Sequence, residues 1–369
     1  MEGNTIKIGA LCLLSILCWL GGILRPSTGR VSTGWLAVAC TYLVIVIHYF
    51  YVGDSIADNT NTILLFGAAL LTLPLCARSA FDLSALLKPV ALIFGIGALL
   101  FLLLNLPPAL LGSEDSLIDG NYVGTTANAN MLGGYLSLYC FPLLLHGARR
   151  FQNRQLRMLS WLLLAACCYL IVLTRSRAAL LVVCAASIYL VLTTSHLRRN
   201  GKLLLLALIF AGTAGAALQA SDKYGDADLL STRSILVFQR ITAISERPWL
   251  GWGFNADVYS YYDESNVFPA MEKGNTVLQC FEEFGVPLGS FIVVGLYYLI
   301  WRAAMVLRRQ PDGLAFSALL IGSGVHLMFE TWLFNFPALL SIFFWLALLI
   351  AILSSGPKSP GATLAHNNT

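Results

Sequence analysis

The sequence has few charged residues and no paired cysteine motif. Only 11% of its 369 residues are Asp, Glu, Lys or Arg and 57% are hydrophobic, whereas a soluble domain carries about 25% charged residues. This composition excludes an ordinary soluble globular domain. The nine cysteines form no CxxC pair and lie mostly in apolar stretches, which argues against a metal site or a disulfide framework. The sequence has no basic face rich in aromatic residues, which argues against a nucleic-acid partner.

Long apolar runs fill most of the chain instead. Runs of about 20 apolar residues are typical of transmembrane helices. The first run lacks the basic n-region and the cleavage site of a signal peptide, so it is counted as a span. The sequence therefore predicts an all-α polytopic membrane protein with about 11 transmembrane helices. The expected spans are 7–24, 34–52, 61–76, 89–106, 127–147, 158–174, 178–195, 203–220, 284–301, 313–331 and 335–354.

Charge is distributed unevenly between the loops. With this set of spans the loops fall into two alternating groups, and one group holds most of the 23 lysines and arginines but only two acids, Asp82 and Asp312. The positive-inside rule assigns such loops to the cytoplasm. The C-terminus then lies inside, and both the N-terminus and residues 229–289 lie outside.

Residues 229–289 form the longest polar segment. Loops longer than about 12–15 residues are usually functional or disordered, and this segment is too rich in Trp, Tyr and Phe for a disordered one. Apolar residues from Ile235 to Ile244 recur at helical spacing and stop before Pro248. This pattern predicts an amphipathic helix on or near the membrane surface. Arg233 and Arg240 are seven residues apart, so they lie on the same side of that helix.

A pair of arginines interrupts the apolar residues 158–193. A single helix over this range would be about 54 Å long, whereas the hydrocarbon core of a bilayer is about 30 Å thick. We therefore predict two spans that turn at Arg175 and Arg177, on the outer side of the membrane. Two guanidinium groups at the mouth of a helical hairpin favour an anion site, and snorkelling toward lipid phosphates is the alternative.

Two further polar positions lie at the outer ends of expected spans. Asn128 and Asn130 can cap the fifth span, and a helix N-terminus at this face is also a ready anion site; the two interpretations are compatible. His48 lies near the outer end of the second span without a charged neighbour on its own helix. For His48 a structural hydrogen bond is the simpler interpretation, and catalysis is the alternative.

Several short motifs follow one another between residues 124 and 289. They are Gly124…Asn130-Met-Leu-Gly133, Thr174-Arg-Ser-Arg-Ala178, Arg233 ahead of Pro248-Trp-Leu-Gly-Trp-Gly253, Gly274-Asn-Thr-Val-Leu-Gln279, and Glu283-Phe-Gly285. In this order, region 124–289 resembles the O-antigen ligase/polymerase family. The flanking spans resemble the family only in number and hydropathy.

The resemblance implies an integral membrane glycosyltransferase in the bacterial inner (cytoplasmic) membrane, with its active site facing the periplasm. Members of this family move a glycan from undecaprenyl diphosphate to an acceptor sugar in lipopolysaccharide or surface polysaccharide biosynthesis. The acceptor is lipid A-core for ligases and another lipid-linked repeat for polymerases. The resemblance also implies no metal cofactor. The expected partners are this lipid-linked donor, the acceptor glycan and the bilayer.

The expected spans and the long polar segment divide the chain into four parts. Residues 1–220 form an N-terminal bundle of about eight spans. Residues 221–283 form a long periplasmic loop with short amphipathic helices and active-site elements. Residues 284–354 form the C-terminal transmembrane helices, and residues 355–369 form a cytoplasmic tail.

Site residues are carried over from the matching motifs. The Ser-Arg pair of the family corresponds to Ser176-Arg177, and its loop arginine corresponds to Arg233. The departing diphosphate carries about two negative charges, which arginine binds bidentately. Arg177 and Arg233 are therefore the expected catalytic arginines. The expected substrate-binding residues are Arg175, Arg240, Asn130, Asn275 and Trp252.

One position departs from the family pattern. Gly274 stands where the family commonly has a histidine that acts as a base or orients the acceptor, so a substitute base is needed. His326 is one candidate, because Glu330 lies four residues away and could orient the imidazole; a hydrogen bond between helices is the alternative. The candidate bases are Glu272, Asp263, Glu264 and His326, of which Glu272 and His326 are taken as the expected catalytic residues.

Other function classes stay open at this point. A polymerase of the same family would share every motif. A transporter or flippase of lipid-linked or anionic solutes would also need many spans, but the two halves show no internal repeat and no matching pair of Gly/Pro-broken helices. A membrane scaffold without chemistry would leave the outer arginines unexplained.

Overall fold

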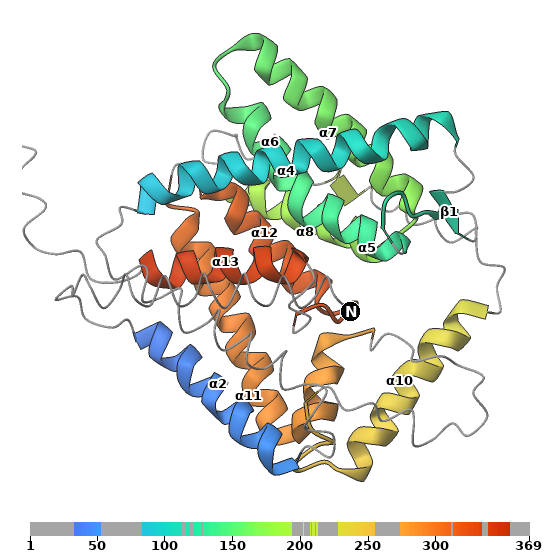
Figure 1. The fold of residues 1–369 in the computed structure, drawn as a ribbon, viewed down its shortest axis with the longest axis vertical. Helices are drawn as coiled ribbons and strands as arrows, with labels where there is room; N and C mark the ends of the chain where they lie inside the picture. Colours follow the sequence, from blue (N-terminus) through green and yellow to red (C-terminus); the bar gives the residue numbers. More distant parts are fainter. Residues whose placement is uncertain are drawn as a thin grey trace, which may run out of the picture.

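The computed structural model describes residues 33–52, 83–112, 116–118, 121–126, 128–193, 228–254, 274–310, 313–333 and 339–354, with isolated positions between 202 and 212. These residues are mostly helical, which agrees with the predicted class (Figure 1). The expected spans 7–24 and 61–76 lie outside the described residues, and so does 203–220 apart from isolated positions.

Helices cover the other expected spans. They are α2 (Thr33–Val52), α4 (Leu83–Leu111), α7 (Arg154–Thr174), α8 (Arg177–Thr193), α11 (Thr276–Leu307), α12 (Leu314–His326) and α13 (Leu339–Ser354), together with the consecutive segments α5 (Ala129–Gly134), η2 (Tyr135–Cys140) and α6 (Phe141–Arg150). Within the described residues, 4 helices are long and apolar enough to cross a membrane: Ala91–Leu111, Ala129–Arg149, Arg154–Thr174 and Thr276–Leu307. The chain is thus a mostly helical protein of membrane type.

Several helix boundaries differ from the sequence prediction, and three of them bear on the site. α4 continues through Pro107 and Pro108 to Leu111 instead of ending at residue 106. α11 begins at Thr276, before the expected start at 284, because Asn275 caps it and because a kink at Gly285 joins two helical parts. α12 ends at His326 instead of residue 331, because the chain enters a turn at Leu327.

The helix formed by α5, η2 and α6 is the centre of the bundle. All residues from Leu132 to Pro142 are buried, and η2 contacts α4, α7, α8, α12 and α13. Small residues allow the close contacts: a Cβ atom on Gly133 would lie 2.9 Å from the Cβ of Ala179 in α8. η2 is a π-helical segment, a rare geometry that is frequent at functional sites.

Two smaller elements stand outside this bundle. The strands β1 (Leu117–Ile118) and β2 (Asn121–Tyr122) form a short antiparallel hairpin between α4 and α5, with Leu117 opposite Tyr122. α10 (Asp228–Glu246) is the helix predicted within residues 229–289, and it ends two residues before Pro248. In Figure 1, α10 and α2 converge with the kinked part of α11 at one end of the molecule.

Candidate functional site

The predicted turn between two helices at the arginines is confirmed. α7 ends at Thr174, Arg175 caps it, and α8 begins at Arg177. Arg175 has φ 52, in the left-handed region, which costs a residue with a side chain about 1–2 kcal/mol. Strained backbone of this kind clusters at functional sites. The turn therefore holds Arg175 in a strained backbone conformation two residues before Arg177.

Ser176 and Arg177 have different surroundings in this turn. Ser176 is buried, and its Oγ accepts a hydrogen bond from the backbone N–H of Ala179 at 3.4 Å, which makes it the N-terminal cap of α8. Arg177 is exposed at the first residue of the same helix. The serine of the Ser-Arg motif is thus structural, and the arginine reaches the surface.

The Asn-rich motif packs directly against this turn. A Cβ atom on Gly133 would lie 2.9 Å from the Cβ of Ser176, so only a residue without a side chain fits there. Asn128 accepts a hydrogen bond from the backbone N–H of Met131 at 2.7 Å, which confirms its predicted role as a helix cap. Asn130 is the second residue of α5 and is half-buried. The motif around Asn130 and the arginine turn therefore form one unit.

His326 packs against Gly134, the last residue of α5. Its imidazole would be 3.2 Å from a Cβ atom on Gly134, and its Nδ1 accepts a hydrogen bond from Nε1 of Trp332 at 2.6 Å. Because the indole N–H of Trp can only donate, a neutral His326 carries its proton on Nε2. Within the described residues this Nε2 has no hydrogen-bond partner. The imidazole is thus set up to donate a hydrogen bond, which a general base does not do.

The hydrogen bond that orients the His326 ring does not come from the predicted partner, Glu330. α12 ends at His326, and Glu330 lies one turn further along, where its backbone N–H donates to the His326 carbonyl at 3.0 Å. Trp332 supplies the hydrogen bond that orients the ring. Sequence spacing could not reveal this partner, because the chain leaves the helix between the two residues.

The Gly274-Asn275 motif is brought to the same place. Asn275 caps α11 and accepts hydrogen bonds from the backbone N–H groups of Val277 and Leu278. Thr276 donates its N–H to the Leu327 carbonyl at 3.0 Å and its hydroxyl to the Glu330 carbonyl at 2.6 Å. The start of α11 therefore lies beside the turn that follows His326.

These contacts join the separate motifs into one site. Asn275 lies beside Thr276, which contacts Leu327; His326 precedes Leu327 and packs on Gly134; and Gly133 packs on Ser176 of the arginine turn. Among the residues that the structure describes, no three His, Cys, Asp or Glu side chains gather where they could hold a metal.

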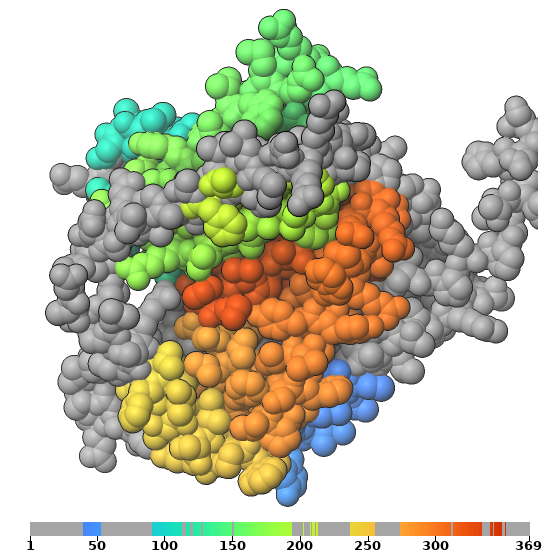
Figure 2. Space-filling model, turned by 180° about the vertical axis from the view of Figure 1, so that it is seen from behind, coloured from blue at the N-terminus to red at the C-terminus, as the bar shows by residue number. Residues whose placement is uncertain are grey.

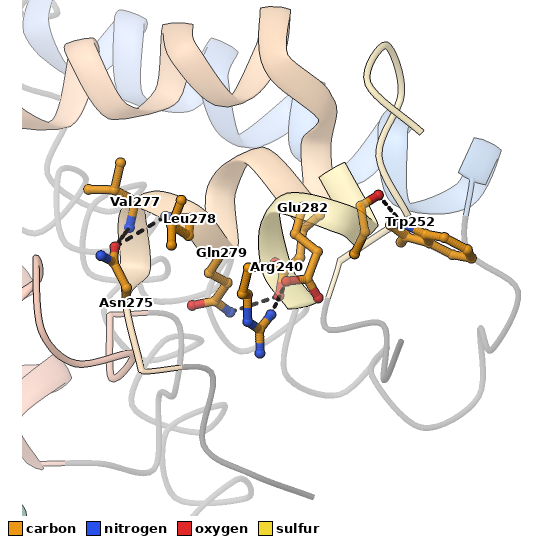
Figure 3. A network of polar contacts seen from close by, with 9 residues as sticks. Arg240, Trp252, Asn275, Val277, Leu278, Gln279 and Glu282 are labelled. Atoms are coloured by element: carbon orange, nitrogen blue, oxygen red, sulfur yellow. Dashed lines mark hydrogen bonds and ion pairs between the residues drawn. The ribbon is translucent and has the colours of Figure 1, made fainter. Parts of the chain in front are cut away.

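A buried ion pair connects α10 to α11. Nη1 of Arg240 contacts Oε2 of Glu282, and the two residues are 2% and 0% exposed (Figure 3). Next to them, Nε2 of Gln279 donates a hydrogen bond to Oε1 of the buried Glu283 at 2.7 Å. Arg240 was predicted to bind substrate, but in this structure its guanidinium faces a carboxylate of the protein. The sequence signal for this pair was two consecutive glutamates in an apolar helix.

The turn that follows α10 is docked on α11 by backbone hydrogen bonds. The N–H groups of Trp252 and Gly253 donate to the carbonyls of Glu282 and Glu283 at 2.9 Å, and Val286 donates to the Pro248 carbonyl at 2.7 Å. These three bonds join residues 248–253 to the kink of α11. The Pro-Trp-Leu-Gly-Trp-Gly and Glu-Phe-Gly motifs are therefore two halves of one contact.

Trp252 and His48 also stabilise this contact. Nε1 of Trp252 donates to the Ala243 carbonyl at 2.8 Å, and the guanidinium of Arg247 stacks 4.0 Å from the centre of its ring. Nε2 of His48 donates to the Leu250 carbonyl at 2.6 Å. The structural interpretation of His48 is thus supported, with a loop carbonyl as its partner. Trp252, predicted to bind substrate, has an indole N–H that is already used within the protein.

Two glycines permit this close docking, and one of them gives a test. Gly251 and Gly285 have φ values of +69 and +73, and Cβ atoms on them would collide with backbone atoms of the opposite segment. We expect Gly285→Ala to lower the free energy of unfolding by about 2–4 kcal/mol, from left-handed strain and overpacking. Gly295→Ala is the matched control, because this glycine of α11 has open space around it. Equal thermal midpoints of the two variants in detergent would contradict the expectation.

The other predicted residues of the insert are described only in part. Arg233 lies in α10, two helical turns or about 10 Å along the axis from Arg240, and its side chain lies outside the described part. Glu272, Asp263 and Glu264 lie outside the described residues. Their roles stay predictions.

A known protein family matches the same part of the chain as this site. Residues 161–293 match the family described as O-antigen ligase. The matched segment begins in α7 and ends in α11, so it contains the arginine turn, α10 and the docked turn. No curated protein matches the chain. The match over residues 161–293 supports the family that the order of the motifs indicates.

Proposed function

We propose that this chain is a membrane glycosyltransferase that moves a glycan from undecaprenyl diphosphate to an acceptor sugar at the periplasmic face. The match of residues 161–293 to the O-antigen ligase family supports a role in polysaccharide assembly. The observation that carries the finer proposal is the arginine turn, in which Arg175 has a strained backbone and Arg177 is exposed. Ser176 between them packs against Gly133 of the Asn130 motif. This arrangement suits a diphosphate better than a neutral ligand, because guanidinium groups form forked contacts with phosphate.

The arginines supply the chemistry in this proposal. As the anomeric C–O bond breaks, negative charge grows on the departing diphosphate, and Arg177 stabilises it. Arg233 approaches the same group from α10, which the Arg240–Glu282 pair holds against α11. Arg175 assists from the turn. Preorganised donors of this kind lower a barrier by about 3–4 kcal/mol each.

The acceptor hydroxyl needs other groups. His326 donates from Nε2, because Trp332 occupies Nδ1; it therefore orients an oxygen, and Glu272 is the base that the proposal assigns. The side-chain NH2 groups of Asn130 and Asn275 bind oxygens of the lipid-linked glycan donor. For Asn275 the NH2 group is the one available, because its side-chain carbonyl oxygen is already used in the helix cap. Arg240 and Trp252 support the site by positioning α10 and the docked turn.

The proposed topology follows the charge distribution. About 11 spans hold the site at the outer face of the bacterial inner membrane. Residues 1–220 form the first bundle, residues 221–283 the periplasmic loop, residues 284–354 the last helices and residues 355–369 a cytoplasmic tail. Apolar residues cover the outside of the described helices, as membrane helices require; examples are Leu104, Leu162 and Phe291.

The experiment that tests the proposal is mass analysis of surface and lipid-linked glycans after deletion of the gene. For a ligase, polymer is lost from the lipid core while long lipid-linked chains accumulate. Complementation with Arg233→Ala is expected to leave this defect, whereas Arg302→Ala restores the glycan. Arg302 is the matched control because it is an exposed arginine at the other end of α11.

Two other outcomes are informative. Accumulation of single lipid-linked repeats would assign the chain to the polymerase branch of the same family. Unchanged glycans after deletion would overturn the proposed function.

A further inference from the structure

α10 buries a charged residue and exposes large apolar residues. The buried face carries the charged Arg240, which is 2% exposed, together with Ala243. The outward face carries Val237, Phe238 and Ile241, with Phe238 71% exposed. A helix at the surface of a soluble protein shows the opposite pattern, with apolar residues inward. Water is therefore a poor environment for the outward face of α10.

The docked turn continues this apolar face. Trp249 is 76% exposed and Leu250 is also exposed. Both residues are held outward by the backbone, because the Pro248 carbonyl accepts from Val286 and the Leu250 carbonyl accepts from His48. The indole of Trp249 is thus presented by a rigid turn.

The same contacts join this face to the apolar surfaces of two further helices. Val286 begins the outward stripe of α11, which continues with Phe291 and Val294 and belongs to a candidate membrane span. His48 belongs to α2, whose outward residues include Phe50 and Tyr51. Figure 2 shows α10 with its turn, α11 and α2 as adjoining areas of one face.

We propose that Phe238, Ile241, Trp249 and Leu250 insert into the leaflet at this end of the bundle, with lipid acyl chains as their occupant. The apolar stripe of α11 must meet acyl chains if α11 spans the membrane, and the face of α10 is continuous with it. Trp at a membrane interface places its apolar ring among lipid chains and its N–H toward water. α10 is then an in-plane membrane helix whose inward face carries Arg240. This placement does not depend on the proposed reaction.

The test uses Trp fluorescence of the full-length protein in phosphatidylcholine vesicles with plain or dibrominated acyl chains. Subtracting the emission spectrum of Trp249→Phe from that of the wild type gives the emission of Trp249. We expect that emission to be blue-shifted and to lose most of its intensity in brominated vesicles. In the double variant Phe238→Ser, Ile241→Ser, brominated lipid should quench Trp249 less, because two polar residues disturb the insertion of α10.

Trp252→Phe is the matched control. Its ring is half-buried against Arg247, so its difference emission should be insensitive to brominated lipid. The proposal is overturned if Trp249 emits as an indole in water and is quenched by acrylamide alone. Protection of Trp249 from both quenchers also overturns it, because another protein segment or a second copy then covers the face. Trp249→Phe should keep the thermal midpoint, since the ring is exposed.

Discussion

Arg177→Ala is expected to abolish glycan transfer while the protein still folds and inserts into the membrane. Arg177 is an exposed residue, so truncation removes little packing, and Ser176 rather than Arg177 caps α8. Loss of one preorganised group that stabilises developing charge costs about 100- to 1000-fold in rate. The measurement is transfer from a polyprenyl-diphosphate-linked glycan to acceptor by purified protein in vesicles.

Two variants decide how this result is interpreted. Arg177→Lys should also be impaired, because an ammonium group cannot form the forked contact of a guanidinium. Arg302→Ala should transfer at the wild-type rate, since Arg302 lies at the other end of α11. Transfer at the wild-type rate by Arg177→Ala would remove this residue from the site. Full activity of Arg177→Lys would reduce the role of Arg177 to that of a point charge.

Arg240→Ala is expected to lower the free energy of unfolding by about 3–5 kcal/mol. The change leaves Glu282, which is 0% exposed, as a buried carboxylate without its cation. Its other oxygen, Oε1, has no hydrogen-bond partner among the described residues, so no second donor is in place to compensate. The loss can be followed by thermal unfolding in detergent and by proteolysis within residues 229–289, since α10 would be released from α11.

The double replacement Arg240→Met with Glu282→Leu separates burial from charge. Replacing both members of a buried pair by apolar residues is often neutral or stabilising, so this variant should regain most of the lost stability. The single and double variants also distinguish a structural Arg240 from one that binds substrate. If Arg240→Ala unfolds like the wild type but transfers no glycan, its role is in binding, and the anchoring role assigned to the pair is wrong.

Elements with a strong local signal could be predicted from the sequence. The arginines within residues 158–193 predicted a helical turn because one helix of that length exceeds the bilayer, and α7 and α8 meet there. Pro248 predicted the end of α10. Asn128 was predicted as a cap. Each of these depends on residues close in sequence, which is why pattern and spacing were sufficient.

Contacts between distant segments were not predictable in the same way. The seven-residue spacing placed Arg233 and Arg240 on one side of a helix, but the partner of Arg240 is a glutamate in another helix. The pair His326 and Glu330 satisfied a helical spacing, yet α12 ends at His326 and Trp332 is the partner. A single sequence does not show which distant segments contact each other in the folded chain.

The sequence by itself determined the class of the molecule, because apolar length and loop charge follow directly from the cost of placing polar groups in hydrocarbon. It also indicated a family, through the order of short motifs, and residues 161–293 match that family. The tertiary structure alone decided that α5, the arginine turn, the start of α11 and the end of α12 meet. Gly133 and Gly134 allow these approaches, to Ser176 and to His326. Close packing is a property of pairs of segments that no single segment contains.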